Sequence, residues 1–225
     1  MDKTGLPYAL QAREPCGDGV GAPLRCSAVD ARPARGEVLR DLVARTPVDS
    51  TAVLASTGFC GRELYAIDDR RNQLYMVGSM GCVVPLALGL AMARPDLQVV
   101  AVDGDGAALM RLGAFVTVGA YGPANLRHLL LDNGVHESTG GQATVSAGVS
   151  FAQIARACGY ADSIESDDLE AVMAWFDRPP AAGPRFARLL TRSGTPDDLP
   201  RPSMTPVQVK DRFMSHFCPS VGVQS

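Results

Sequence analysis

The sequence has no long hydrophobic run, no large excess of charge of one sign and no leader of the secretory type. Its longest apolar stretch, residues 83–93, is too short to span a bilayer, and the first residues lack the positive and then apolar order of a signal peptide. The net charge is only −3 and no basic cluster is present, so neither nucleic acid nor a membrane is an expected partner. We expect a soluble protein.

Paired cysteines are also missing. All six cysteines stand singly, without Cys-x-x-Cys spacing, which argues against a zinc or iron–sulfur site and against a secreted disulfide scaffold. A reducing cytoplasm is therefore the expected location. The six are Cys16, Cys26, Cys60, Cys82, Cys158 and Cys218.

The 225 residues are enough for one domain with a substantial core. Residues 1–34 mix proline, glycine and arginine without periodicity, which predicts an N-terminal linker or arm. Residues 35–217 are expected to form the domain, and residues 218–225 a C-terminal tail.

Strand and helix patterns alternate within the predicted domain. This alternation is typical of a doubly wound, mainly parallel α/β sheet with helices on both faces. Ser166 and Thr205 are expected to cap helices, with Pro206 in a first turn. The expected strands are residues 51–56, 74–77, 98–102, 126–131 and 185–190, and the expected helices are residues 37–45, 61–67, 81–93, 107–120, 149–158, 167–177 and 205–217.

Two polar side chains follow apolar strands of the predicted sheet. Asp105 lies in a Gly-Asp-Gly motif after one strand, and Asn133 closes the next strand along the chain. Because the carboxyl ends of parallel strands meet at one edge of a sheet, we expect the two side chains to lie close together there. A carboxylate, an amide oxygen and main-chain carbonyls suit Mg2+. The alternative is a turn aspartate and a loop asparagine, which are both common.

A Gly-Asp-Gly followed at this spacing by an asparagine resembles the thiamine-diphosphate motif. Residues 75–81, 104–113 and 131–146 look like phosphonopyruvate decarboxylase, and residues 62–65 and 78–81 are similar to sulfopyruvate decarboxylase β subunits. Three separate motifs in the right order make a chance match improbable.

Two details distinguish these relatives. His136 and the Gly-Gly-Gln at residues 140–142 favour the phosphonate enzyme. The resemblance extends over about residues 35–217, and it implies the thiamine diphosphate-binding fold of the diphosphate-binding (PP) type.

The resemblance also implies roles for individual residues. Asp105, Asn133 and the Val135 carbonyl would hold Mg2+. Met80 would be the apolar wedge beneath the cofactor, and the Gly78 carbonyl would accept a hydrogen bond from its 4′-amino group, although a methionine is more often a core filler. Small residues, hydroxyls and first-turn amides are the remaining candidates for binding the cofactor, although simple turns explain some of them nearly as well. They are Ser56, Thr57, Gly58, Gly104, Gly106, Ala107, Ala108, Ser138 and Thr139.

His136 is the candidate proton donor among three histidines. Imidazole titrates near neutral pH, so it could return a proton after decarboxylation; an exposed loop histidine is the alternative. His128 and His216 are expected to be structural or surface residues. Four arginines could pair with a substrate anion, although most arginines are solvated surface charges. Arg62 is slightly favoured, because it lies in the family-like segment. The four are Arg62, Arg70, Arg71 and Arg111.

The function implied by the resemblance is thiamine diphosphate-dependent decarboxylation of a small anionic 2-oxo acid, 3-phosphonopyruvate, to phosphonoacetaldehyde and CO2 in phosphonate and antibiotic biosynthesis. The family's activating glutamate lies on a separate pyrimidine-binding domain, for which residues 1–34 leave no room. We therefore expect a separate α subunit that carries this domain, in an α2β2 assembly. Residues 134–144 could close over the substrate.

Several alternatives stay open at this point. The chain could be a sulfopyruvate decarboxylase β subunit, or a non-catalytic scaffold or regulatory subunit of the same fold. The scattered cysteines argue against the β subunit of a 2-oxoacid:ferredoxin oxidoreductase. A nicotinamide-binding fold is disfavoured, because no Gly-x-Gly-x-x-Gly follows the expected strands.

Overall fold

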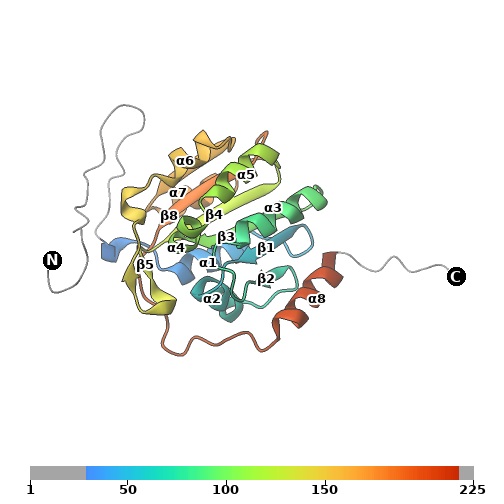
Figure 1. Cartoon of the computed structure of the whole chain (residues 1–225). Helices are drawn as coiled ribbons and strands as arrows, with labels where there is room; N and C mark the ends of the chain where they lie inside the picture. Colours follow the sequence, from blue (N-terminus) through green and yellow to red (C-terminus); the bar gives the residue numbers. More distant parts are fainter. Residues whose placement is uncertain (1–28, 218–225) are drawn as a thin grey trace.

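The computed structural model describes residues 29–217, so most of the predicted linker and the whole predicted tail lie outside the described residues. Six parallel strands form one sheet in the order β2-β1-β3-β4-β8-β7, which confirms the expected fold class (Figure 1). The domain limits stay a prediction. The strands are β1 (Thr51–Ala55), β2 (Gln73–Tyr75), β3 (Gln98–Gly104), β4 (Leu126–Asp132), β7 (Asp162–Ser166) and β8 (Arg185–Leu190).

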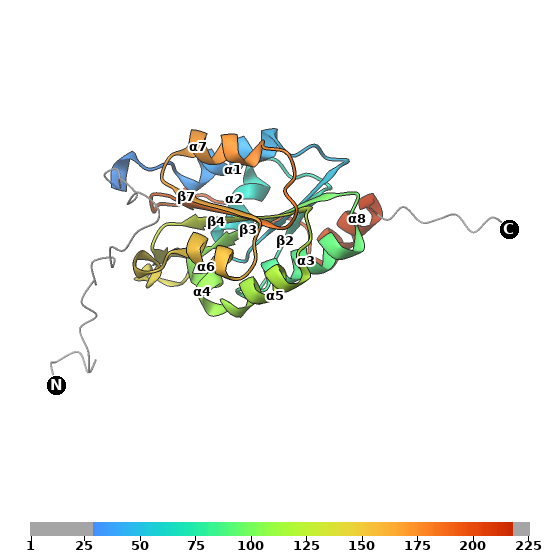
Figure 2. The ribbon, with the colours of Figure 1, turned by 90° about the horizontal axis from the view of Figure 1, so that it is seen from above.

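Helices cover both faces of the sheet. They are α1 (Arg35–Ala44), α2 (Phe59–Ile67), α3 (Val83–Ala93), α4 (Asp105–Met110), α5 (Gly113–Tyr121), α6 (Phe151–Ala157), α7 (Leu169–Phe176) and α8 (Pro206–Phe217), with short 3-10 turns η1 (Val29–Ala31), η2 (Glu137–Thr139) and η3 (Ser146–Gly148). Helices α1, α2 and α7 lie on one side and α3 to α6 on the other, with α8 at the β2 end (Figure 2). Each layer buries its own apolar core.

The central strands are buried on both sides because their residues alternate between the two cores. In β3, Val99 and Ala101 belong to the core under α3 to α6, while Val100 and Val102 belong to the core under α1, α2 and α7. All four are fully buried. An unbroken apolar run is what a parallel strand covered by helices on both faces requires.

Two elements differ from the sequence-based expectation. Strand β7 was missed because its segment, Asp-Ser-Ile-Glu-Ser, has one apolar residue, and its place at the edge of the sheet needs no more. The expected helix over residues 107–120 is divided, since Arg111 leaves the helical conformation (φ −129°). A Cβ on Gly81 would lie 2.6 Å from the Arg111 side chain, so a neighbouring turn packs against this break.

The two expected helix caps had different outcomes. Thr205 is a cap, since its hydroxyl accepts the Gln208 N–H at 3.3 Å. Ser166 was wrong: Asp168 caps α7 by accepting the Glu170 N–H at 2.9 Å, and Ser166 instead accepts the Asp168 N–H.

Residues 191–205, which we call the strap, link β8 to α8 along the outside of the molecule past α2 (Figure 1). The Arg62 guanidinium donates hydrogen bonds to the carbonyls of Leu199 and Pro200, and the Tyr65 hydroxyl donates to Ser203 at 3.2 Å. Arg62 therefore holds the strap, and its role in binding a substrate anion stays a prediction.

The outer sides of α3 and α5 carry no charged residue. Leu86 on α3 is 45% exposed, and Val116 and Tyr121 on α5 are 59% and 63% exposed. Surface helices normally present charged or polar groups outward. Over residues 29–217, no helix combines the length and the apolar character needed to cross a membrane.

Candidate functional site

A cleft opens at the carboxyl edge of the sheet, where β1, β3 and β4 end. Parallel pairing aligns Gly104 with Leu131, so the segments that follow these two residues leave the sheet side by side. The segment after β4, residues 133–146, folds into a hairpin of β5 (Val135–His136) and β6 (Gln142–Ala143) that forms one wall. The predicted site residues that line the cleft are Ser56, Thr57, Gly58, Met80, Gly104, Asp105, Gly106, Ala107, Asn133, Val135, His136 and Ser138.

Asp105 and Asn133 face this cleft from neighbouring segments. Asp105 is 3% exposed, and its carboxylate accepts a hydrogen bond from the Thr144 hydroxyl. Burial, with the nearby negative charge of Asp132, raises the pKa of Asp105 above its ordinary range. The Asn133 side-chain oxygen accepts the Val135 N–H at 3.2 Å, so the asparagine oxygen lies at the start of the hairpin.

The second buried carboxylate of this edge, Asp132, has its own cation. Arg188 lies 2.6 Å from Asp132 Oδ2, and the Ser146 hydroxyl donates to Asp132 Oδ1 at 2.9 Å. Asp105 has no ion pair of this kind among the described residues, so a buried carboxylate faces the cleft without a balancing cation.

That imbalance fits a divalent cation. Among residues 29–217 no cluster of three or more His, Cys, Asp and Glu side chains could hold a metal ion. A site here would therefore combine the one carboxylate of Asp105 with amide, main-chain and phosphate oxygens. This donor set suits Mg2+, which is usually bound by one or two carboxylates plus substrate phosphates.

Met80 reaches the cleft from a tight turn. Gly78, Ser79 and Gly81 all have positive φ angles (74°, 53° and 84°), and Ser79 is the only non-glycine residue with positive φ in the described part of the chain. Such a conformation is costly for a residue with a Cβ and persists where the surroundings fix it. The Gly78 N–H donates to the Thr57 hydroxyl at 3.1 Å, which joins this turn to the loop after β1.

His136 contacts the first turn of α4. A Cβ added to Gly106 would lie 2.3 Å from the imidazole Cε1, so the ring packs directly on the glycine backbone. On the same wall, a Cβ added to Gly58 would lie 3.3 Å from the Ser138 hydroxyl. A side chain at Gly106 would therefore displace the His136 ring, and Gly58 is favoured by its positive φ of 97°.

Arg35 fixes the outer end of the hairpin. Its guanidinium donates to Glu63 at 2.6 Å, to Glu137 at 2.8 Å and to the Thr195 hydroxyl at 2.9 Å. Burial alone would raise the pKa of Glu137, but hydrogen bonds from Gly194 N–H and Arg35 hold it below its ordinary value. Arg35 thus joins α1, α2, the hairpin and the strap.

Cys60 also lines the cleft but does not suit nucleophilic chemistry. The residue is 8% exposed, and burial raises the pKa of its thiol to about 12. The thiol is therefore protonated at neutral pH, and no covalent step is assigned to it.

Three predicted cofactor contacts do not line the cleft: Gly78, Ala108 and Thr139. Ala108 is buried in the core, and Thr139 donates weakly to the His136 carbonyl at 3.4 Å.

The remaining histidines and arginines also lie away from the cleft lining. His128 is fully buried beside Asp103, and His216 hydrogen-bonds the Val48 carbonyl, so both are structural. Arg70 pairs with Asp68, while Arg71 and Arg111 are exposed.

The sequence-based interpretation missed Arg35, Thr144 and the pair of Asp132 with Arg188. One signal was available: Arg188 interrupts an apolar strand, and a buried arginine needs a carboxylate partner. Asp132, at the end of the neighbouring strand, was the natural candidate. Nothing local marks Arg35 or Thr144.

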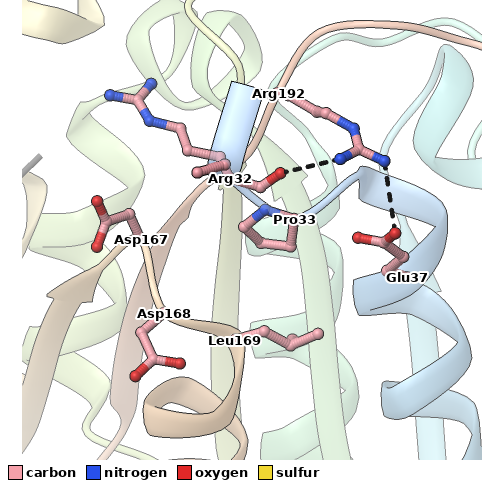
Figure 3. Close-up of a pocket in the computed structure, with 8 residues that line it drawn as sticks. Arg32, Pro33, Glu37, Asp167, Asp168, Leu169 and Arg192 are labelled. Atoms are coloured by element: carbon pink, nitrogen blue, oxygen red, sulfur yellow. Dashed lines mark hydrogen bonds and ion pairs between the residues drawn. The ribbon is translucent and has the colours of Figure 1, made fainter. Parts of the chain in front are cut away.

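A second pocket is separate from this cleft and contains none of the predicted site residues. It lies between η1, α1 and the start of α7 (Figure 3). Arg192 crosses it, hydrogen-bonding the Arg32 carbonyl and Glu37, each at 3.4 Å. Asp168, on its other side, caps α7. Its polar side chains thus have structural partners.

The chain is similar in sequence to several known proteins. Residues 56–178 match the thiamine pyrophosphate enzyme C-terminal TPP-binding domain. Phosphonopyruvate decarboxylase of Streptomyces viridochromogenes is 47% identical over 81% of this chain and 46% of its own length, and that of Streptomyces hygroscopicus is 45% identical over 82% and 46%. The chain thus spans about half the length of these two relatives.

Two further comparisons cover other lengths. Sulfopyruvate decarboxylase subunit beta of Methanothermobacter thermautotrophicus is 35% identical over 74% of this chain and 87% of its own length. An X-ray structure from Mycobacterium smegmatis, described as thiamin diphosphate-dependent, has a TM-score of 0.58 at 24% identity and covers 73% of this chain and 32% of its own. That likeness shows the fold alone. By its sequence matches, the chain belongs to the thiamine pyrophosphate enzymes, in the family of the phosphonopyruvate and sulfopyruvate decarboxylases.

Proposed function

We propose that this chain is the diphosphate-binding part of a thiamine diphosphate-dependent decarboxylase that converts 3-phosphonopyruvate to phosphonoacetaldehyde and CO2. The observation that carries the proposal is the buried, unbalanced Asp105 carboxylate at a cleft with Asn133 beside it. The sequence similarity to two phosphonopyruvate decarboxylases supports the substrate. The reaction would serve phosphonate and antibiotic biosynthesis in the cytoplasm.

The metal end of the site is built from oxygen donors. Asp105, the Asn133 side chain and the Val135 carbonyl would hold Mg2+, which would in turn bind the diphosphate. The small residues Ser56, Thr57 and Gly58 and the first-turn amides of α4 would contact the phosphates. Gly104, Ala108, Ser138 and Thr139 stay candidates for the edges of this site.

The reacting end of the site is built from the turn at residues 78–81 and from the hairpin. Thiamine diphosphate, when bound, supplies the electron sink for loss of CO2. Met80 would support the cofactor from below, and the Gly78 carbonyl would accept a hydrogen bond from it. His136, which packs on Gly106 beside Asp105, would donate the proton that completes the product.

A second domain would complete the site. The matched phosphonopyruvate decarboxylases are about twice as long as the matched region, whereas the sulfopyruvate decarboxylase relatives are named as β subunits. We propose that a separate α subunit supplies the pyrimidine-binding domain and the activating glutamate, in an α2β2 assembly. The uncharged outer sides of α3 and α5 favour burial against another protein.

Calorimetry on the chain together with a pyrimidine-binding α subunit tests the cofactor. We expect thiamine diphosphate to bind in the presence of Mg2+ and to bind poorly after chelation with EDTA. Uptake that does not depend on the metal would contradict the proposed site, and no uptake at all would favour a non-catalytic scaffold.

Release of CO2 then tests the substrate and the partner. We expect faster turnover of 3-phosphonopyruvate than of sulfopyruvate, and activity only from the assembled subunits. Faster turnover of sulfopyruvate would assign the chain to the second family of relatives, and robust activity of the chain alone would refute the need for an α subunit.

A further inference from the structure

Thr144 contacts both segments that carry the proposed metal ligands. Its hydroxyl donates a hydrogen bond to Asp105 Oδ2 at 2.5 Å, and its main-chain N–H donates to the Gly134 carbonyl at 2.8 Å. Gly134 lies between Asn133 and Val135. One residue therefore ties the carboxylate at the start of α4 to the segment that follows β4.

The hydroxyl bond also sets the rotation of the Asp105 carboxylate. When Oδ2 is held by Thr144, the direction of Oδ1 follows from the planar geometry of the group. A ligand group that is fixed before the metal arrives loses less conformational freedom on binding, which strengthens binding. A partner that orients a ligand in this way typically changes metal affinity by about 10-fold to 100-fold.

The Ser146 hydroxyl lies 3.0 Å from the Thr144 hydroxyl, but it donates its own proton to another carboxylate. Ser146 donates its single hydroxyl proton to Asp132 at 2.9 Å, and Arg188 neutralises that carboxylate. Thr144 serves Asp105, the carboxylate without a cation. The two buried carboxylates of this edge are thus held by two hydroxyls of the same segment, and only the Thr144 bond leads to the cleft.

We infer that Thr144 is a positioning residue that joins Asp105 to the Asn133–Val135 segment and so organises the proposed metal site before the metal binds. The identity of the metal rests on the proposed function, but the link that Thr144 makes between the two segments is a property of the chain itself. Valine at this position has nearly the same shape without the hydroxyl, and serine keeps the hydroxyl.

Two measurements on the chain with its α subunit test this. The affinity for Mn2+, used as the probe for Mg2+, is measured by electron paramagnetic resonance in the presence of thiamine diphosphate. We expect Thr144→Val to weaken it by about 10-fold to 100-fold and Thr144→Ser to restore most of it. Thr46→Val is the matched control, because the Thr46 hydroxyl is equally bonded within the chain, but to the carbonyls of Leu42 and Val43 and not to Asp105 or residues 133–146.

Hydrogen exchange of the amides in residues 133–146 gives a readout that needs no metal. Thr144→Val should speed exchange in this segment, while Thr144→Ser and Thr46→Val should not. Equal Mn2+ affinity in Thr144→Val and the unsubstituted chain would overturn the inference. Failure of the unsubstituted chain to bind Mn2+ would overturn the proposed function instead. The exchange data would then test the link made by Thr144 without any metal, and unchanged exchange in Thr144→Val would refute it.

Discussion

Two buried arginines hold the 133–146 segment from opposite sides, and they differ in what they hold. Arg35 contacts the outer end through Glu137, and through Thr195 it also reaches the strap. Arg188 contacts the inner end through Asp132 and the Ser146 carbonyl. The first joins four separate segments at the rim, and the second pairs with Asp132 in the floor and lies 3.6 Å from Glu165.

The difference shows which charge the cleft leaves for a ligand. Both guanidinium groups are already bonded to carboxylates within the chain, so neither is free to bind a substrate anion. Asp105, which lies between the two networks, faces the cleft and has no guanidinium partner among the described residues. The cleft is therefore suited to a cation.

The largest expected effect comes from removing either guanidinium. Arg188→Met leaves Asp132, which is 2% exposed, as an uncompensated buried charge, and the free energy of unfolding should fall by about 3–5 kcal/mol. Arg35→Met should cost a similar amount, because Glu63 is 4% exposed. Urea unfolding of each variant measures both values.

Arg201→Met is the control for these two substitutions. Arg201 is exposed, so its replacement should change the free energy of unfolding by less than about 0.5 kcal/mol. A stable Arg35→Met variant that has lost only cofactor binding would break the comparison, since Arg35 would then act on the ligand rather than on the fold.

The next effect is expected at Asp105, between the two arginine networks, and it should weaken binding of the cofactor rather than the stability of the fold. Asp105→Asn removes the charge but keeps an acceptor for Thr144, so metal-dependent uptake of thiamine diphosphate should weaken about 100-fold or more, by comparison with the effects of second-sphere groups. The unfolding free energy of the metal-free chain should not fall, because the repulsion from Asp132 is removed. Asp198→Asn, at an exposed site, should alter neither quantity. A marked loss of stability would mean that the Asp105 charge is balanced within the chain.

The smallest expected effect is a difference in pH dependence. Above the ordinary value of 3.8, the folded metal-free chain binds more protons at Asp105 than the unfolded chain, so stability falls as the pH rises towards the raised pKa. Glu137 has the opposite sign: its lowered pKa stabilises the fold above pH 4.5, and this contribution is lost as the pH falls through the native value. The free energy of unfolding should be measured from about pH 3 to about pH 7, a range that covers these pKa values. Its slope against pH should change in opposite directions in Asp105→Asn and Glu137→Gln. Changes of the same sign would contradict the distinction.

Much of the fold could be predicted because the central strands are almost purely apolar. Residues 99–102 are buried on both faces, so their composition alone identified the strand. Edge strand β7 could not be found in this way, since it contributes one apolar side chain. Gly81, in another segment of the chain, packs against the break between α4 and α5, and no local pattern signals that contact.

The site could be predicted only where function depends on adjacent residues. Gly-Asp-Gly and the asparagine after β4 form short local patterns, and the structure brings them to one cleft. Arg35 and Glu137 are 102 residues apart, and no local signal connects them. The contacts of Arg62 could not be predicted for the same reason, because the carbonyls that it binds lie 137 and 138 residues away in the strap.

The uncharged outer sides of α3 and α5 have a consequence for how such a chain can be produced. An exposed apolar surface of this kind favours aggregation. Copies of the chain on which this side is exposed would then be lost to precipitation or to quality control. Keeping this side covered from the time of synthesis is therefore a requirement of the surface.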